Sequence, residues 1–101
     1  MPYMYILECA DSSYYTGSTW DLNRRVKQHA DGMGANYTAG RLPIKLVYFE
    51  QYARVVDAYV REKQVQGWTH HKKSALIAGR DDDLHYLAKC INSTHHLKPA
   101  R

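Results

Sequence analysis

The residues of this chain that could do chemistry are phenols, a guanidinium, an imidazole and a carboxylate. A short N-terminal stretch carries Tyr5, Tyr15, Arg25 and His29, where a plain core would use valine, leucine or phenylalanine. Tyrosine contributes nine aromatic residues, against two tryptophans and one phenylalanine. A tyrosine packs like an apolar ring but keeps a hydroxyl group that can form hydrogen bonds. This bias toward tyrosine therefore indicates a partly hydrated edge of the core, a binding surface or an active site.

Glu62 is a carboxylate on an otherwise apolar stripe. It shares one face of a helix predicted over residues 53–66 with Val55, Ala58 and Val65. Because burying an isolated carboxylate is costly, Glu62 must be paired, protonated or metal-bound. One interpretation is a structural ion pair with an arginine, and the other is a divalent metal ligand or a catalytic group.

Three strands are expected around these residues, and the first two form a hairpin. Residues 3–9 alternate between two faces, which places Tyr3, Tyr5 and Leu7 on one side and Met4 and Ile6 on the other. Turn residues at 10–13 lead to a returning strand over 14–17, and a third strand covers 44–50. A polar loop over 32–43 precedes that third strand.

A helix after the hairpin positions the arginine and the histidine. Ser18 and Asp21 form a capping signature for this helix, which is expected to end near residue 30. His29 falls on the apolar stripe of the helix. Arg25 lies one turn before His29 on the same side, whereas Arg24 points away from the stripe.

The order of elements indicates an α+β fold, with a small three-stranded antiparallel sheet flanked by about four helices. Helices are expected over 53–66, 69–79 and 81–92 in addition to the one after the hairpin. Three aspartates at 81–83 suit a helix N-terminus and need no metal to explain them. Residues 1–92 are predicted to form one domain and residues 93–101 a flexible C-terminal tail.

Charge and cysteine content narrow the functional classes. The formal net charge of +4 and the pI of about 9.1 weakly favour a polyanionic partner. Cys9 and Cys90 make neither a disulfide framework nor a zinc site. Neither a signal peptide nor an apolar run of membrane length occurs, so we expect a cytoplasmic protein with no membrane partner.

Four segments occur in an order that resembles the GIY-YIG nuclease superfamily. They are "YMY" at residues 3–5, "YTG" at 15–17, "RRVKQH" at 24–29 and "REKQVQGW" at 61–68. The resemblance covers about residues 3–80 and is to small single-domain bacterial members and to the N-terminal nuclease domain of the bacterial excinuclease. Of the two motifs that name the superfamily, this chain retains the tyrosine of each and the glycine of the second. These residues are Tyr5, Tyr15 and Gly17.

This resemblance implies a metal-dependent endonuclease that hydrolyses phosphodiester bonds in DNA. It implies structure-selective or weakly sequence-specific cutting, in repair or recombination. Tyr5 would be the general base or its relay, and Tyr15 would position the phosphate or the attacking water. His29 would share a proton with Tyr5 or bind the phosphate.

The remaining roles that the resemblance implies concern the phosphate and a metal ion. Arg25 would hold the phosphate, because its guanidinium matches two phosphate oxygens. Gly17 would let the backbone approach the phosphate or turn sharply out of the strand. Glu62 would bind one Mg²⁺ or Mn²⁺, since substrate and water supply the other ligands. Many catalytic members also carry an asparagine after the glutamate helix, for which Asn92 is the nearest candidate.

DNA is the expected partner, and RNA is not excluded. A basic rim would contact phosphates without reading sequence. The loop residues Asn36, Tyr37 and Thr38 would touch a phosphate or an unstacked base. The rim consists of Arg24, Lys27, Arg41, Lys63, Lys72 and Lys73. Two alternatives stay open: a non-catalytic nucleic-acid-binding module of the same fold, and a protein that depends on another protein for substrate choice.

Overall fold

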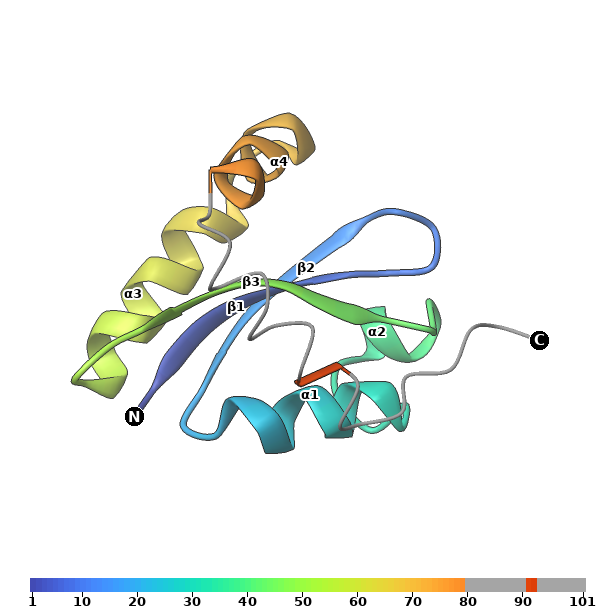
Figure 1. Cartoon of the computed structure of the whole chain (residues 1–101), viewed down its shortest axis with the longest axis horizontal. Coiled ribbons are helices and arrows are strands. Elements are labelled where there is room, and N and C mark those ends of the chain that lie inside the picture. The colour runs from blue at the N-terminus through green and yellow to red at the C-terminus, as the bar shows by residue number, and fades with distance from the viewer. Residues whose placement is uncertain (80–90, 93–101) are drawn as a thin grey trace.

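A three-stranded antiparallel sheet is the frame of the protein (Figure 1). The computed structural model describes residues 1–79 and 91–92. The strands are β1 (Tyr3–Glu8), β2 (Tyr14–Thr19) and β3 (Lys45–Gln51), in the spatial order β2-β1-β3. The hairpin of β1 and β2 is therefore as predicted, with β1 at the centre of the sheet and β2 at one edge.

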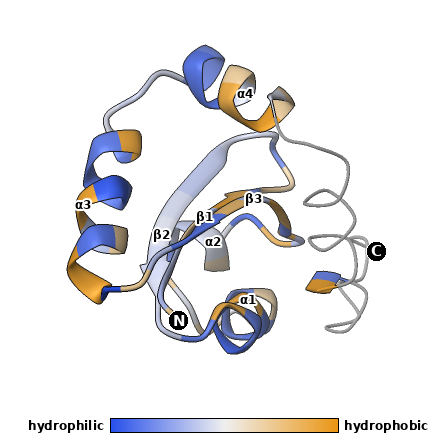
Figure 2. Cartoon of the chain, turned by 60° about the vertical axis from the view of Figure 1, so that its left-hand side comes forward, coloured by the Kyte–Doolittle hydropathy of each residue, from blue (hydrophilic) through white to orange (hydrophobic). Residues whose placement is uncertain are grey.

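Helices cover both faces of this sheet. Helix α1 lies on one face, and α3 and α4 lie on the other (Figures 1 and 2). The described residues form α1 (Leu22–Ala30), α2 (Asn36–Ala39), α3 (Val55–Gln66) and α4 (His70–Ala78). The predicted α+β fold is confirmed. Every helix within residues 1–79 and 91–92 is too short or too polar to cross a lipid bilayer.

Two segments of the predicted organisation are not tested. The helix expected over 81–92 lies outside the described residues except at 91 and 92, and so do its three aspartates. The tail expected over 93–101 lies wholly outside them. The segment 32–43, expected to be a loop, contains the four-residue helix α2. A single turn of helix is too short to give a periodic pattern, which explains why the sequence did not reveal it.

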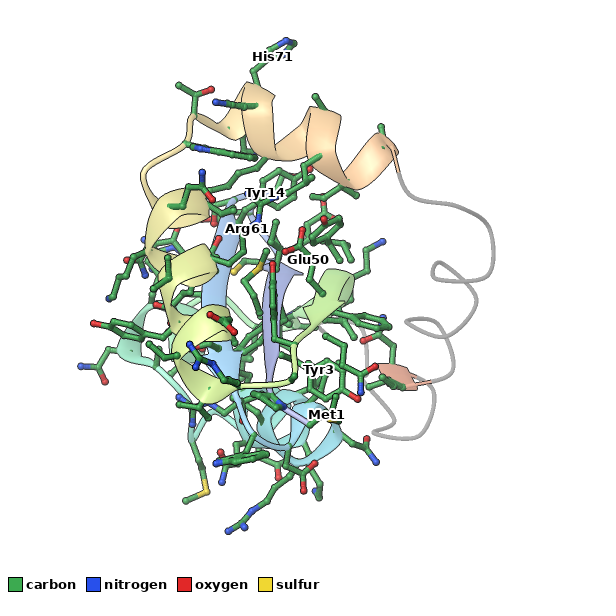
Figure 3. The ribbon with its side chains drawn as sticks, turned by 90° about the vertical axis from the view of Figure 1, so that its left-hand side faces the viewer. Met1, Tyr3, Tyr14, Glu50, Arg61 and His71 are labelled. Atoms are coloured by element: carbon green, nitrogen blue, oxygen red, sulfur yellow. The ribbon has the colours of Figure 1, made fainter. Side chains whose placement is uncertain are left out.

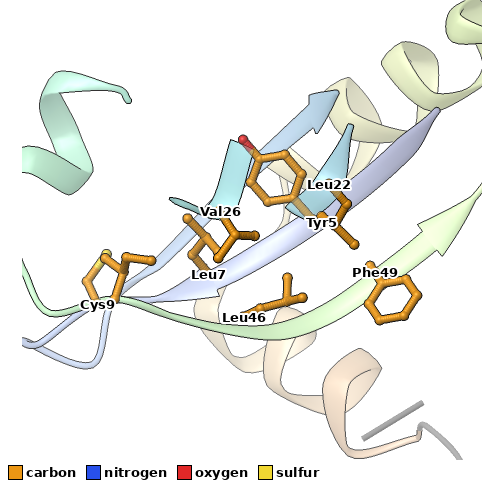
Figure 4. Packing of buried hydrophobic residues seen from close by; sticks show 8 residues of the cluster. Tyr5, Leu7, Cys9, Leu22, Val26, Leu46 and Phe49 are labelled. Carbon is orange, nitrogen blue, oxygen red and sulfur yellow. The ribbon is translucent and has the colours of Figure 1, made fainter. Parts of the chain in front are cut away.

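Strand β1 separates two hydrophobic clusters, as its alternation predicted. Tyr5 and Leu7 pack with Val26 of α1 in the cluster on one face of the sheet (Figure 4). Met4 packs with Val65 of α3 in the cluster on the other face. Each fully buried apolar side chain contributes about 1.5–3 kcal/mol, so the two clusters hold α1 and α3 on opposite sides of β1.

Helix α1 begins differently from the prediction. Asp21 is its N-cap, and the Asp21 carboxylate accepts a hydrogen bond from the backbone N–H of Arg24 at 3.1 Å. Ser18 was expected to cap this helix but lies within β2. The strand continues to Thr19, two residues beyond the predicted end, because its pairing with β1 extends that far.

An ion pair links helix α3 to strand β3. Arg61 donates to both carboxylate oxygens of Glu50 on β3, at 3.0 and 3.2 Å, and Figure 3 shows the two side chains reaching toward each other. Ala58 and Glu62 face the sheet, as predicted. Val55 was placed on the same stripe and is 48% exposed, because it lies in the first turn, beyond the end of the packed surface.

Candidate active site

A buried tyrosine–histidine pair lies between β1 and α1. The Tyr5 hydroxyl is 2.8 Å from His29 Nε2, and the two residues are 1% and 0% exposed. Gly17 is the residue opposite Tyr5 on β2. A Cβ atom at Gly17 would lie 2.5 Å from the Tyr5 hydroxyl oxygen. The missing side chain therefore lets the Tyr5 ring extend over the edge strand β2.

The electrostatics of this pair keep both groups neutral. Burial raises the pKa of the Tyr5 phenol to about 12, although a hydrogen bond and the charge of Arg25 act to lower it. Burial also lowers the pKa of His29 to about 4, and the charge of Arg25 acts in the same direction. At neutral pH the phenol is therefore protonated and the imidazole is uncharged.

Arg25 lies beside this pair and lines an open hollow of about 380 Å³ at the end of β2. Its Nη1 donates to Gln28 Oε1 at 2.9 Å. Arg24, expected to point away, lines the same hollow, together with Ser18. Two guanidinium groups around one concave surface suit an anion with several oxygens, such as a phosphate.

Tyr15 lies on the same face of the sheet as Tyr5, two residues before Gly17. Its ring centroid is 5.2 Å from that of His29 and 6.1 Å from that of Tyr37. Tyr15 is half-buried, and its ring packs against the imidazole. The structure thus brings Tyr5, Tyr15 and His29 into one cluster.

Glu62 approaches β2 from the opposite face of the sheet. Ser18 Oγ donates to Glu62 Oε1 at 2.6 Å, and Gln66 Nε2 donates to Oε2 at 3.3 Å. Lys63 Nζ is 3.6 Å from the same Oε2. The predicted alternative of an arginine ion pair is wrong, since these are its partners in the described residues and the neighbouring Arg61 pairs with Glu50.

The donor set at Glu62 fits a magnesium-type ion better than a transition metal. Residues 1–79 and 91–92 contain no group of three or more histidine, cysteine, aspartate or glutamate residues that could hold a metal. Glu62 offers hard carboxylate oxygens and is 9% exposed, at the rim of the packed surface. Mg²⁺ keeps most of its water and commonly uses one or two carboxylates with substrate phosphate, so a single glutamate suffices.

Two residues predicted to bind nucleic acid are buried. Thr38 is 0% exposed, because its hydroxyl turns inward to His29 Nδ1 at 2.8 Å. Lys73 is 8% exposed, because it lies on the α4 face that carries Leu76 and Ile77 toward the sheet. Burial lowers the pKa of Lys73. Neither side chain is placed to contact a nucleic acid, and both predictions are wrong.

The other members of the predicted rim lie at the surface. Arg24, Lys27, Lys63 and Lys72 are exposed, and Arg41 is half-buried. Arg41 stacks over the exposed Tyr37 ring at 3.8 Å and pairs with Asp11 at 3.1 Å, so its charge is already partly engaged. Asn36 is exposed at the start of α2.

Asn92 lies away from the cluster. Its Oδ1 accepts from the Leu46 N–H at 2.8 Å, and its Nδ2 donates to the Leu46 carbonyl at 3.0 Å. Leu46 is on β3, at the edge of the sheet opposite to β2. Both polar groups of this amide therefore satisfy the backbone of β3, and Asn92 is not a member of the site.

Sequence reasoning missed two residues that shape the site. A Cβ atom at Gly34 would lie 2.3 Å from His29 Nδ1, so this glycine is packed against the imidazole ring. Ser18 was interpreted as a helix cap, and it is instead a hydrogen-bond donor to Glu62. The alternation of β2 could have revealed Ser18, since Thr16 and Ser18 share one face of the strand.

Comparison of the sequence with known proteins indicates one family. The sequence profile described as "GIY-YIG catalytic domain" matches residues 1–75. The UPF0213 protein CPE1444 of Clostridium perfringens is 46% identical over 92 residues, covering 91% of this chain and 99% of that protein. The UPF0213 protein HQ_3675A of Haloquadratum walsbyi is 47% identical over 74 residues, covering 73% of this chain and 83% of the relative.

A solved structure supports the same assignment. The solution NMR structure of the UPF0213 protein BH0048 from Bacillus halodurans is 40% identical in sequence and has a TM-score of 0.54. The match covers 88% of this chain and 94% of that protein. Family profile, relatives and fold agree with the resemblance in the sequence, and the chain belongs to the GIY-YIG catalytic domain family.

Proposed function

We propose that this protein is a divalent-metal-dependent endonuclease that hydrolyses phosphodiester bonds in DNA. One observation carries the proposal: the Tyr5 hydroxyl is hydrogen-bonded to His29 and lies within electrostatic reach of both Arg25 and Glu62. A proton-transfer pair, an anion-binding guanidinium and a carboxylate for a hard cation are the groups that phosphodiester hydrolysis needs.

The proton leaves the attacking water by a relay. A free phenolate is scarce at neutral pH, because the pKa of Tyr5 is about 12. The Tyr5 oxygen therefore takes the water proton while it passes its own proton to Nε2 of His29, which is uncharged and 2.8 Å away. The water oxygen bonds to phosphorus as the bond to the leaving oxygen breaks, and no phenolate accumulates.

The remaining groups hold the substrate. Arg25 binds the non-bridging phosphate oxygens in the hollow at the end of β2, and Tyr15 closes the side of the site next to His29. Glu62 would hold a divalent cation, which would supply Lewis acidity at the scissile phosphate. Ser18 and Gln66 keep the Glu62 carboxylate oriented toward β2 by their hydrogen bonds.

The surface favours structure-selective or weakly sequence-specific cutting. Exposed lysines and arginines contact phosphates, which position a nucleic acid without reading its bases. Three exposed lysines are groups of this kind. Lys27 lies in the last turn of α1, Lys63 in the last turn of α3 and Lys72 in the first turn of α4. An enzyme of this type suits DNA repair or recombination, where the shape of the substrate identifies the site of cutting.

The test is a cleavage panel on labelled single-stranded DNA, duplex, flap, fork and RNA, with Mg²⁺ or Mn²⁺ against EDTA. We expect metal-dependent cleavage that Tyr5→Phe and Glu62→Gln abolish. Arg25→Ala should slow it at least about 100-fold, the effect of removing one transition-state contact. Binding should survive Glu62→Gln.

Matched controls come from the same elements. Tyr52 donates to Glu50 on the other face of the sheet, so Tyr52→Phe removes a tyrosine hydroxyl outside the site. Asp57→Asn removes an exposed carboxylate from the same helix as Glu62. Activity that survives all the site variants would come from a contaminant. Binding without cleavage would favour a non-catalytic or partner-dependent module.

A further inference from the structure

We propose that Thr38 is a positioning residue that fixes the tautomer of His29, with the proton on Nδ1 and a free lone pair on Nε2. Its catalytic consequence rests on the proposed function, since it concerns the relay from Tyr5. The tautomer itself does not depend on that function. Thr38 is the buried residue of α2, the short helix that interrupts the loop before β3.

The hydrogen bond that Thr38 donates determines where the proton of His29 lies. Thr38 Oγ1 donates to the Ala35 carbonyl at 3.0 Å. A hydroxyl has a single proton, so Thr38 can only accept in its 2.8 Å contact with His29 Nδ1. The proton in that contact must be on Nδ1, and a neutral imidazole then has an unprotonated Nε2.

The other end of the chain of hydrogen bonds follows from this tautomer. An unprotonated Nε2 can only accept in its contact with the Tyr5 hydroxyl. The Tyr5 proton therefore points to His29 Nε2, which accepts it at 2.8 Å. Protons thus run from Tyr5 to His29, from His29 to Thr38 and from Thr38 to the Ala35 carbonyl.

The surroundings keep the imidazole in this orientation. His29 is 0% exposed, and the Tyr15 ring lies at 5.2 Å from it with an interplanar angle of 57°. Gly34 approaches so closely that a Cβ atom there would lie 2.7 Å from both Cε1 and Cγ of the ring. The ring has little room to turn, so the proton position depends on which atom faces Nδ1.

Removal of the Thr38 hydroxyl should change which nitrogen of His29 carries the proton. Thr38→Val keeps the shape of the side chain and leaves Nδ1 without an acceptor. The imidazole proton then moves toward Nε2, where it faces Tyr5 and blocks transfer of the phenolic proton. Thr38→Ser restores the hydroxyl and is the matched control.

The experiment measures the ring nitrogens of His29 by long-range ¹H–¹⁵N NMR in the full chain. We expect a protonated Nδ1 and a bare Nε2 in the native protein and in Thr38→Ser, and loss of that pattern in Thr38→Val. A native His29 protonated on Nε2 would overturn the proposal, and so would an unchanged pattern in folded Thr38→Val. If Thr38→Val does not fold, the native spectrum and Thr38→Ala decide.

Kinetics then separate this proposal from the proposed function. With a substrate that the native chain cleaves, Thr38→Val should lower kcat about 100-fold with little change in KM, and Thr38→Ser should recover it. A native chain that shows the expected tautomer and cleaves no nucleic acid would refute the nuclease and leave the Thr38 assignment in place. Equal kcat values in Thr38→Val and the native chain would remove its catalytic role.

Discussion

The buried imidazole of His29 makes the stability of the fold depend on pH. It is 0% exposed and packed against Tyr5, Tyr15 and Thr38, and Arg25 is the charged group beside it. Protonation would place a second positive charge next to that guanidinium. Acid should therefore weaken the folded state at pH values where exposed histidines simply titrate.

The size of the effect follows from the two pKa values. The pKa of His29 falls from 6.5 to about 4 on folding, chiefly because of burial, which corresponds to about 3 kcal/mol. Between these values the unfolded chain binds more protons than the folded one, so stability falls as pH falls. From about pH 7.5 to about pH 5 the loss should be about 2 kcal/mol, before most carboxylates titrate.

Urea unfolding at these two pH values measures the loss, with His29→Gln as the control. The variant keeps a polar side chain but cannot titrate, so its free energy of unfolding should change by about 2 kcal/mol less than that of the native chain. The other histidines are common to both proteins and cancel in the difference. If the two proteins lose the same stability between the two pH values, His29 is not a buried neutral base and the relay loses its acceptor.

Two further pairs of substitutions test the packing and the surface. Gly34→Ala should destabilise the fold by about 1–3 kcal/mol in thermal or urea unfolding, since its Cβ would lie 2.3 Å from the imidazole. Gly67→Ala, whose nearest contact would be 3.7 Å, should be nearly neutral, and equal effects would contradict the close approach. Lys72→Ala should reduce the salt slope of DNA binding by about one, whereas Lys73→Met should leave it unchanged. Equal slopes would mean that burial of Lys73 does not exclude it from the interface.

Periodic patterns predicted the elements that hold the site. Alternation in β1 placed Tyr5 with Leu7 on one face, and the structure confirms both positions. The helical stripe through Val26 placed His29 on the inner face of α1, where it is buried. These patterns are visible because strands and helices repeat over six or more residues, so each side chain has neighbours that indicate its face.

Contacts that depend on tertiary structure could not be predicted from these patterns. Thr38 is in a single turn of helix, where a polar residue after asparagine and tyrosine looks like surface. Lys73 was assigned to the surface by its residue type, although its place in α4 faces the sheet. Gly34 owes its role to a ring that is five positions earlier in sequence, and one sequence gives no signal of such proximity.

The position of β2 accounts for a glycine and a serine in succession at the proposed site. Tyr5 and Glu62 belong to opposite faces of the sheet, so a phosphate that contacts both, as the proposed function requires, would have to pass around an edge. β2 is that edge. Gly17 lets the Tyr5 ring extend across the strand on one face, and Ser18, which points to the other face, holds the Glu62 carboxylate at the same level. A further strand paired to β2 would close this passage, and within the described residues β2 pairs with β1 alone.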